Sequence, residues 1–349
     1  MSDESDPNET SWWDADATQR AETRPLTTHG TRPLAANPTR PLSGAAERAD
    51  AGAEAEQVTD GPTEPATTPV SPDSAAESDA GEPPDADEPV ASDVPTIRAA
   101  ALRDRGMVRA VNQDHVFSLL TTLPREEHDL PLGLFVVADG MGGHAGGEIA
   151  SQIAIAAVAE TVLVQLLIPA LGGDVAIALR TLMDDALLAA NGRIWAQAQR
   201  DGSDMGTTCT AALLLGRTLY LGHVGDSRAY VLRRGALLPL TDDHSTVGRL
   251  IALGEVTRES AREHPQRSQL YRSVGQTATI AVDVVVEPLD GAEALLVASD
   301  GLWSMLEETE LHAILRAAAT PEAACSALID AANAAGGDDN ISAVVVMFG

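Results

Sequence analysis

Short turns between consecutive apolar runs constrain the fold of this chain more than any other feature of its sequence. The runs at residues 210–216 (TAALLLG), 218–225 (TLYLGHVG) and 229–234 (AYVLRR) have the length and composition of strands. Short turns join several consecutive runs, as in LLGRTLY at residues 214–220 and LRRGALL at residues 232–238. Links that short connect antiparallel neighbours, because a parallel crossover needs about a dozen residues or more. The sequence therefore predicts antiparallel sheet.

Other runs extend this pattern. Residues 132–138, 280–289, 293–299 and 341–348 are also strand-like, whereas residues 148–168 and 174–200 are long helical patterns rich in Ala and Leu. Long helices combined with many antiparallel strands predict a layered α+β sandwich in which helices cover the faces of the sheets.

The first 94 residues have a different composition. They contain 21 acidic residues against 5 arginines, and no aromatic residue lies between Trp13 and Phe117. Such a segment buries too little apolar surface to offset its ordering entropy. We therefore expect a disordered tail over residues 1–94 and one folded domain over residues 95–349.

The tail contains one repeat, TRPL, which begins at Thr23, Thr31 and Thr39. These tetrapeptides are read either as docking or phosphorylation sites for a regulatory partner, or as duplication drift in a weakly constrained segment. We favour duplication drift, because short motifs often match by chance.

Composition excludes several classes of function. The formal net charge of −29 argues against nucleic acid or an anionic membrane as a direct partner, since both bind basic surfaces. Cys209 and Cys325 lie in apolar surroundings and do not suggest a disulfide framework. The acidic N-terminus does not resemble a signal peptide, and we expect no membrane-spanning run and a cytoplasmic location.

The most distinctive motif is the glycine-rich turn FVVADGMGGHAGGE at residues 135–148. Gly140 and Gly142 partly match a dinucleotide-binding fingerprint, but the acid at the right distance, Glu160, lies inside an uninterrupted helical run where that fold needs a second strand. A P-loop or a Schiff-base enzyme requires a lysine, and all 23 basic residues here are arginine.

Aspartates at the ends of core strands offer a better explanation. Asp139, Asp226 and Asp300 each stand beside glycine at a strand end, and Asp339 precedes the last strand. If these ends converge, the carboxylates repel one another unless a divalent cation binds between them. Ligands that are all oxygen favour Mg²⁺ or Mn²⁺. Arg109 is the candidate for binding phosphoryl oxygens.

An ordered series of motifs now points to one family. The segments DRGMVRAVNQD, VVADGMGGHAGGE, MGTTCTAALL, LGHVGDSRAYVLR, LVASDGLW and GGDDNISAVVV together resemble the bacterial metal-dependent protein serine/threonine phosphatases of type 2C, the PPM family. The resemblance covers residues 97–348. It implies a four-layer α-β-β-α sandwich of two mostly antiparallel sheets flanked by helices, with a flap subdomain at about residues 243–275.

The resemblance also implies an activity, which is hydrolysis of phosphoserine and phosphothreonine in proteins by water activated by two metal ions. Partners would be phosphorylated substrates of serine/threonine kinases. By position, Asp139 matches the aspartate that bridges two Mn²⁺ or Mg²⁺ ions, and Gly140 would bind the first ion through its carbonyl. Asp300 and Asp339 would hold the second.

Further residues match by position. Asp226 corresponds to a ligand of a weaker third ion, shared with Asp300 and the carbonyl of Ser268. Arg109 falls on the phosphate-binding arginine, and Asp114 would hydrogen-bond metal-bound water. Gln113 departs from the family, because many members carry glutamate there.

Two other readings stay open. A binding module that grips phosphoproteins without hydrolysing them would show degenerate metal ligands, and all four expected here are present. A phosphatase that acts on anti-sigma regulators would carry attached sensor domains, whereas only an acidic tail is seen beside this domain.

Overall fold

The computed structural model describes residues 96–349, apart from 126–128, 144–145, 174–176, 258–259 and 261–263. The predicted tail with its TRPL repeats lies outside the described residues. One antiparallel sheet places the last strand of the chain next to the first. Its order is β1 (Ile97–Asp104), β11 (Ile341–Phe348), β10 (Ala292–Ala298), β7 (Arg228–Arg233) and β8 (Ala236–Pro239).

The second sheet is also antiparallel and contains the glycine-rich turn at the end of one strand. Its order is β2 (Asp114–Leu123), β3 (Leu130–Met141), β5 (Cys209–Leu215), β6 (Thr218–Val224) and β9 (Asp283–Pro288), and the short β4 (Gly206–Thr207) pairs with the end of β3. The two short turns expected to form antiparallel hairpins, between β5 and β6 and between β7 and β8, do so. The β6–β7 turn instead passes from one sheet to the other.

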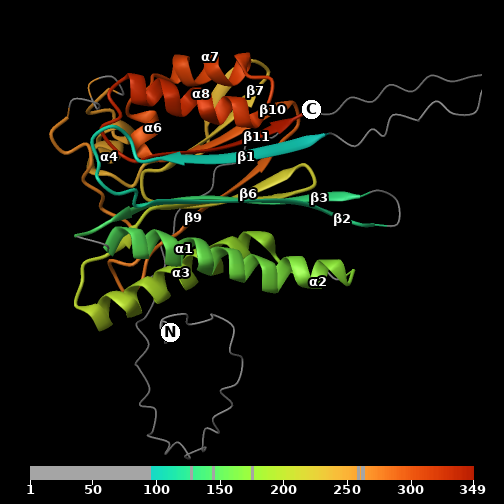
Figure 1. Cartoon of the computed structure of the whole chain (residues 1–349). Helices are drawn as coiled ribbons and strands as arrows, with labels where there is room; N and C mark the ends of the chain where they lie inside the picture. The colour runs from blue at the N-terminus through green and yellow to red at the C-terminus, as the bar shows by residue number, and fades with distance from the viewer. Residues whose placement is uncertain (1–95, 126–128, 144–145, 174–176, 258–259, 261–263) are drawn as a thin grey trace, which may run out of the picture. The chain divides into compact units, whose positions relative to one another are not determined.

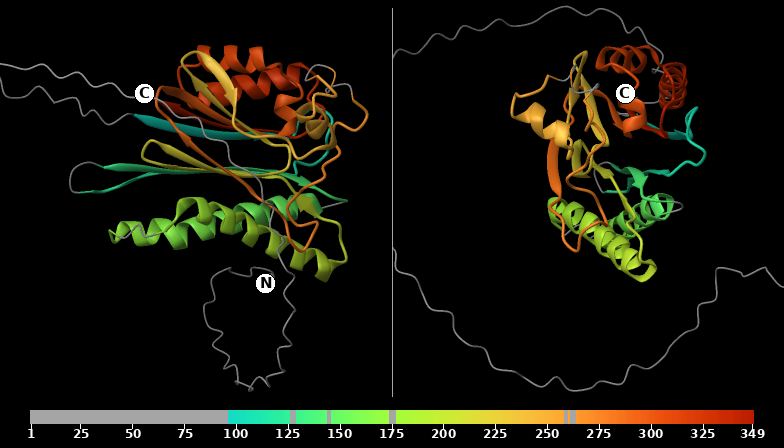
Figure 2. Two further views of the ribbon diagram at one scale, coloured as in Figure 1. Left: turned by 180° about the vertical axis from the view of Figure 1, so that it is seen from behind. Right: turned by 90° about the vertical axis from the view of Figure 1, so that its left-hand side faces the viewer.

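Helices cover the outer face of each sheet. The helices over the second sheet are α1 (Gly146–Val162), η1 (Leu163–Leu167), α2 (Ile168–Leu171) and α3 (Leu179–Asp201). Those over the first sheet are α6 (Asp300–Trp303), α7 (Glu308–Ala317) and α8 (Pro321–Ala334). Figures 1 and 2 show the resulting four layers, which confirm the predicted α-β-β-α sandwich.

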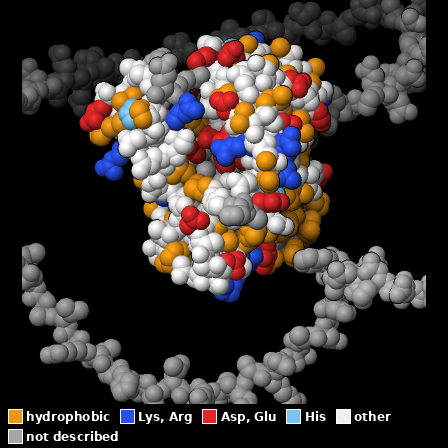
Figure 3. Space-filling model, turned by 60° about the vertical axis from the view of Figure 1, so that its left-hand side comes forward, with side chains coloured by type: hydrophobic (Ala, Val, Ile, Leu, Met, Phe, Trp, Pro, Cys, Tyr) orange, Lys and Arg blue, Asp and Glu red, His pale blue; other side chains and the backbone are white. Residues whose placement is uncertain are grey.

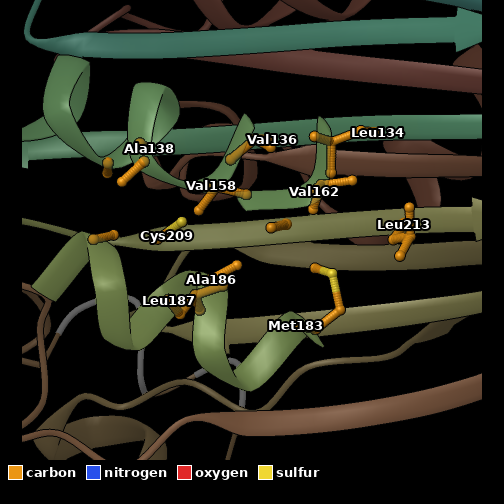
Figure 4. Close-up of a cluster of buried hydrophobic side chains, with 14 of the residues drawn as sticks. Leu134, Val136, Ala138, Val158, Val162, Met183, Ala186, Leu187, Cys209 and Leu213 are labelled. Carbon is orange, nitrogen blue, oxygen red and sulfur yellow. The ribbon is translucent and has the colours of Figure 1, made fainter. Parts of the chain in front are cut away.

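Alternation along β3 explains why two sheets and two helical layers pack together. Successive strand residues point to opposite faces. Leu134 and Val136 therefore pack with α1 and α3, in the cluster that Figure 4 shows around Val158 and Met183. Phe135 lies on the other face, in the core between the two sheets. Both faces of this strand are buried, which accounts for its continuous apolar sequence.

The expectation that no apolar run is long enough to span a membrane was wrong. The run Gly146–Leu171 has 26 residues and a mean hydropathy of 2.1 in its most apolar window, so by length and composition alone it is able to cross a membrane. It is the run of α1, η1 and α2, whose inner side packs on the second sheet. Glu160 lies within α1, so the dinucleotide fold is excluded as predicted.

The segment predicted as a flap, of which residues 258–259 and 261–263 are not described, contains the helix α4 (Thr246–Ala252). Ser245 caps this helix by accepting a hydrogen bond from the Gly248 N–H, 3.0 Å away. The N–H of His244 donates to the carbonyl of Gly225 at 2.8 Å, which attaches the beginning of the flap to the β6–β7 turn.

Candidate metal centre

The acidic side chains predicted from the sequence gather where strands of both sheets end. Asp139 near the end of β3 stands directly opposite Asp114 at the start of β2. Asp300 begins α6 just after β10, Asp226 lies in the β6–β7 turn, and Asp339 comes just before β11. The two sheets therefore bring five carboxylates from distant parts of the chain to one edge of the sandwich.

The backbone around Asp139 is held by two threonines that the sequence did not single out. The Asp139 N–H donates to Thr208 Oγ1 at 3.0 Å, and the Asp139 carbonyl accepts from Thr207 Oγ1 and from the Thr208 N–H, both at 2.8 Å. Gly140 follows at a tight approach to the start of α1, where an added Cβ would lie 2.0 Å from the carbonyl oxygen of Gly147. Only glycine fits there.

Burial and mutual repulsion make the carboxylates hard to ionise. Burial raises the pKa of Asp114 to about 7. Burial and the negative charge of Asp339 raise the pKa of Asp300 to about 6. The pKa of Asp139 is raised well above its ordinary value by burial and then by the charges of Asp114 and Asp300, and that of Asp226 by burial and then by Asp300. Such mutual effects show that the groups share one environment.

Two carboxylate oxygens lack the partner that a cation or a water molecule bound to it would supply. Asp114 Oδ1 and Asp300 Oδ1 are buried and accept no hydrogen bond, which is costly for an oxygen that carries negative charge. Oxygen donors of this kind suit hard divalent ions. In the described part of the chain, however, no three acidic, histidine or cysteine side chains already form a ligand set. Asp339 already has partners, since its Oδ2 lies 2.6 Å from Arg109 and its Oδ1 accepts from the Asn340 N–H at 2.8 Å.

Arg109 reaches the carboxylates because a buried asparagine holds its loop. The Asn340 amide nitrogen donates to the carbonyls of Arg105 and Val111, at 2.9 and 3.0 Å, and its oxygen accepts from the Gln113 N–H at 2.8 Å. The loop on either side of Arg109 is thereby anchored beside Asp339. Nothing local in the sequence indicates this role for Asn340, because its partners lie more than 200 residues earlier.

A cleft leads away from the carboxylates. Asp226, Asp300, Asp339 and Ser268 all line it, so Ser268 of the flap shares this cleft with the two aspartates with which the sequence grouped it. Figure 3 shows acidic side chains within a hollow on this face, with arginine side chains nearby.

Trp303 and Arg228 form a rigid part of the wall of this cleft. The Trp303 Nε1–H donates to the carbonyl of Asp226 at 3.0 Å, and the Arg228 guanidinium stacks 3.5 Å from the centre of the indole ring. Arg228 also makes two hydrogen bonds to Asp243, at 2.7 and 2.9 Å. The turn that carries Asp226 is thus connected to the flap.

Known proteins are similar to this chain in sequence and in fold. The family model described as Protein phosphatase 2C matches residues 109–331. The serine/threonine phosphatase stp of Listeria monocytogenes is 34% identical over 251 residues, which cover 70% of this chain and 92% of stp. The serine/threonine protein phosphatase PstP of Mycobacterium tuberculosis is 39% identical over 253 residues, which cover 71% of this chain and 44% of PstP.

A solved structure agrees with these sequence matches. The catalytic domain of PstP, solved in complex with 2 manganese ions, matches with a TM-score of 0.60 and 33% identity, over 72% of this chain and 98% of that domain. The family model, the related proteins and the solved structure all lead to the same conclusion. The chain belongs to the protein phosphatase 2C family and is a serine/threonine protein phosphatase.

Proposed function

We propose that the chain removes phosphate from phosphoserine and phosphothreonine by direct attack of water, without a phospho-enzyme intermediate and with the help of two divalent ions. The observation that carries this proposal is the gathering of buried carboxylates at the strand ends, with the oxygens Asp114 Oδ1 and Asp300 Oδ1 unpartnered. When bound, the ions lower the pKa of a water molecule and polarise the phosphoryl group.

The chain offers ligands for both ions. Asp139 would bridge them, the Gly140 carbonyl would complete the first site, and Asp300 and Asp339 would hold the second. A weaker third ion would take Asp226 and Asp300 with the carbonyl of Ser268, which share one cleft. Manganese is the ion of choice for testing, because the PstP catalytic domain was solved with two of them, and magnesium is the alternative.

The remaining site residues act on substrate and water. Arg109 binds the phosphoryl oxygens, since its guanidinium already reaches Asp339 and offers two parallel N–H donors. Asp114 orients the attacking water by accepting a hydrogen bond from it. The hydroxyl of Ser342 donates to Asp114 Oδ2 at 2.8 Å and leaves Oδ1 for that purpose.

Phosphorylated proteins, made by serine/threonine kinases, are the proposed substrates, and the cytoplasm is the proposed location. We further propose that the acidic N-terminal segment serves to bind a regulatory partner. Its charge argues for a basic one, because opposite charges speed encounter and favour the matching partner.

The test is hydrolysis of a phosphothreonine peptide by the whole chain, with Mn²⁺ and then with EDTA. Wild-type chain should release phosphate only with Mn²⁺, and Asp139→Asn should release essentially none while staying folded. Asp290→Asn is the matched control, because Asp290 is an exposed turn residue that pairs with Arg217 away from the cleft. Wild-type turnover by Asp139→Asn would refute the proposal, and peptide binding without release would favour a binding module.

A further inference from the structure

The cleft beside the metal centre extends beyond what a phosphate group needs. It has a volume of about 530 Å³ and runs from Asp300 and Asp339 between α4 of the flap and residues 303–309. Pockets that bind drug-sized ligands have roughly this size. We call the part beyond the carboxylates the lateral cleft. A peptide whose phosphorylated residue lies at the carboxylates would place its neighbouring residues there.

The lateral cleft has an apolar part and an acidic part. Val247, Ile251 and Met305 supply apolar side chains from α4 and from the segment after α6. Glu307, Glu308 and Asp338 line the same space. Basic residues are fewer: of the described lining residues, Arg228 and Arg267 are the arginines, and Arg228 is already bonded to Asp243. The cleft thus favours a peptide with one basic and one apolar side chain, and repels an acidic one.

The chain contains this combination three times. In TRPL a threonine is followed by arginine at the next position and by leucine at the third, beginning at Thr23, Thr31 and Thr39. When such a peptide binds, the proline would favour an extended conformation of the arginine before it. At roughly 3 Å per residue, the leucine lies about 9 Å along the peptide from the threonine. That spacing separates an acidic contact near the phosphate from an apolar contact further along the cleft.

We propose that the lateral cleft recognises phosphothreonine followed by arginine and then, at the third position, leucine, and that phosphorylated TRPL segments of this same chain are its substrates. The inference rests on the proposed function. In the reaction, the oxygen of water bonds to phosphorus and the bond from phosphorus to the threonine oxygen breaks. One water proton passes to that oxygen, so the products are threonine and inorganic phosphate.

The reach of the chain allows this substrate. Roughly 57 residues separate Thr39 from Thr96, the first described residue, and fully extended they would span about 190 Å. A segment of this length is able to present its threonines to the cleft of the same molecule or of a second copy. The rate of dephosphorylation at low and at high protein concentration distinguishes these two cases. Only the reaction in the cleft of a second copy becomes faster with protein concentration.

The first experiment varies the peptide and keeps the enzyme unchanged. The probe is the synthetic phosphopeptide of residues 28–37, THGTRPLAAN with phosphate on Thr31, assayed with the whole chain and Mn²⁺. Exchanging Arg32→Glu should lower kcat/KM by about tenfold, because the charge then faces acids. Exchanging Leu34→Ala should lower it by at least about tenfold, because an apolar contact is lost. Equal kcat/KM for all three peptides would overturn the inference.

A variant of the enzyme tests the location of the arginine contact. Glu308→Gln should shrink the preference for the Arg32 peptide over an Arg32→Ala peptide by about two- to fivefold, the size of one exposed ion pair. Glu255→Gln is the matched control, because Glu255 is exposed in the same flap and does not line the cleft. An identical preference in both variants would contradict this assignment.

The outcomes separate this inference from the proposed function. Release of phosphate from p-nitrophenyl phosphate but no discrimination among the peptides would overturn only the inference. No release from either substrate would overturn both. In the native host, the Asp139→Asn chain should carry phosphate on Thr23, Thr31 or Thr39 where wild-type chain does not. Threonines that are bare in both chains would rule out the chain itself as the source of the substrate.

Discussion

Gly140 provides the sharpest test of how the backbone serves this site. It follows Asp139 and touches the beginning of α1. A Cβ at this position would lie 2.0 Å from the carbonyl oxygen of Gly147, 2.4 Å from its carbonyl carbon and 2.7 Å from the carbonyl oxygen of Gln113. All three contacts are with backbone, so no side chain is able to turn away. Gly140→Ala must therefore move the strand end, the helix, or both.

The size of the effect follows from these distances. Bringing the closest contact from 2.0 Å to an ordinary separation requires a shift of more than about 1 Å. Overpacking of this kind costs about 1–3 kcal/mol, which corresponds to a fall in Tm of roughly 2–12 °C for a domain of this size. The shift also displaces the proposed ligand carbonyl and Asp139. A misplacement of about 1 Å typically costs on the order of 100-fold in rate, and we expect that loss in kcat/KM.

Gly143→Ala is the matched control, since a Cβ there meets nothing within 4 Å. The assay combines thermal unfolding of each metal-free chain with kcat/KM on a phosphothreonine peptide in Mn²⁺. Gly143→Ala should match wild type in both. If Gly140→Ala also matched wild type, the close approach at this turn and its role in the metal centre would both be refuted.

Three further predictions concern buried polar groups. Thr208→Val removes the acceptor of the Asp139 N–H and should lower the free energy of unfolding by about 1–3 kcal/mol in urea titrations. The pKa of Asp300 is about 6 in the folded chain and about 4 in the unfolded chain, so the folded chain binds more protons between pH 4 and pH 6, and the stability of the metal-free chain falls as pH rises through this range. The free energy of unfolding of metal-free Asp300→Asn should therefore equal that of wild type near pH 4 and exceed it by about 2–3 kcal/mol at pH 8. The same difference between variant and wild type at both pH values would contradict the raised pKa. Burial lowers the pKa of His223 to about 4, so its effect on stability has the opposite dependence on pH. Neutral His223 contributes about 3 kcal/mol to the free energy of unfolding above pH 6.5, and this contribution is lost as pH falls toward 4. His223→Gln should remove this pH dependence, measured as the midpoint of denaturant unfolding at each pH.

The central strands of both sheets were predictable because their signals are local, whereas β2 and β8 were not among the predicted runs. β11 coincides with the apolar run at residues 341–348, and β6 with all but the last residue of the run at 218–225. Burial on both faces gives these strands uninterrupted apolar sequence, and short turns determine their pairing. The helix α8 was missed, although a start signal was present: Thr320 caps it through the Ala323 N–H, and Pro321 occupies its first turn.

The residues of the site also differ in whether a local sequence pattern predicts them. Aspartate next to glycine at a strand end is a local pattern, so the sequence alone singles out Asp139, Asp226 and Asp300 as candidates. The groups that position them are ordinary polar residues whose roles exist only in the folded chain. Asn340 holds the loop of Arg109 across more than 200 residues, and no spacing rule relates them. Tertiary contacts of this kind leave no trace in a single sequence.

The carboxylate cluster lowers the stability of the metal-free chain, and this destabilisation bears on the function of the site. Burial and mutual repulsion raise the pKa of Asp114, Asp139 and Asp300, and two of their oxygens lack hydrogen bonds. Amide or apolar side chains would remove these penalties, so a sequence shaped only by the stability of the metal-free chain would not retain the acids. A bound divalent cation turns the same repulsion into attraction. The positions that weaken the metal-free fold are therefore ones that help to identify its chemistry.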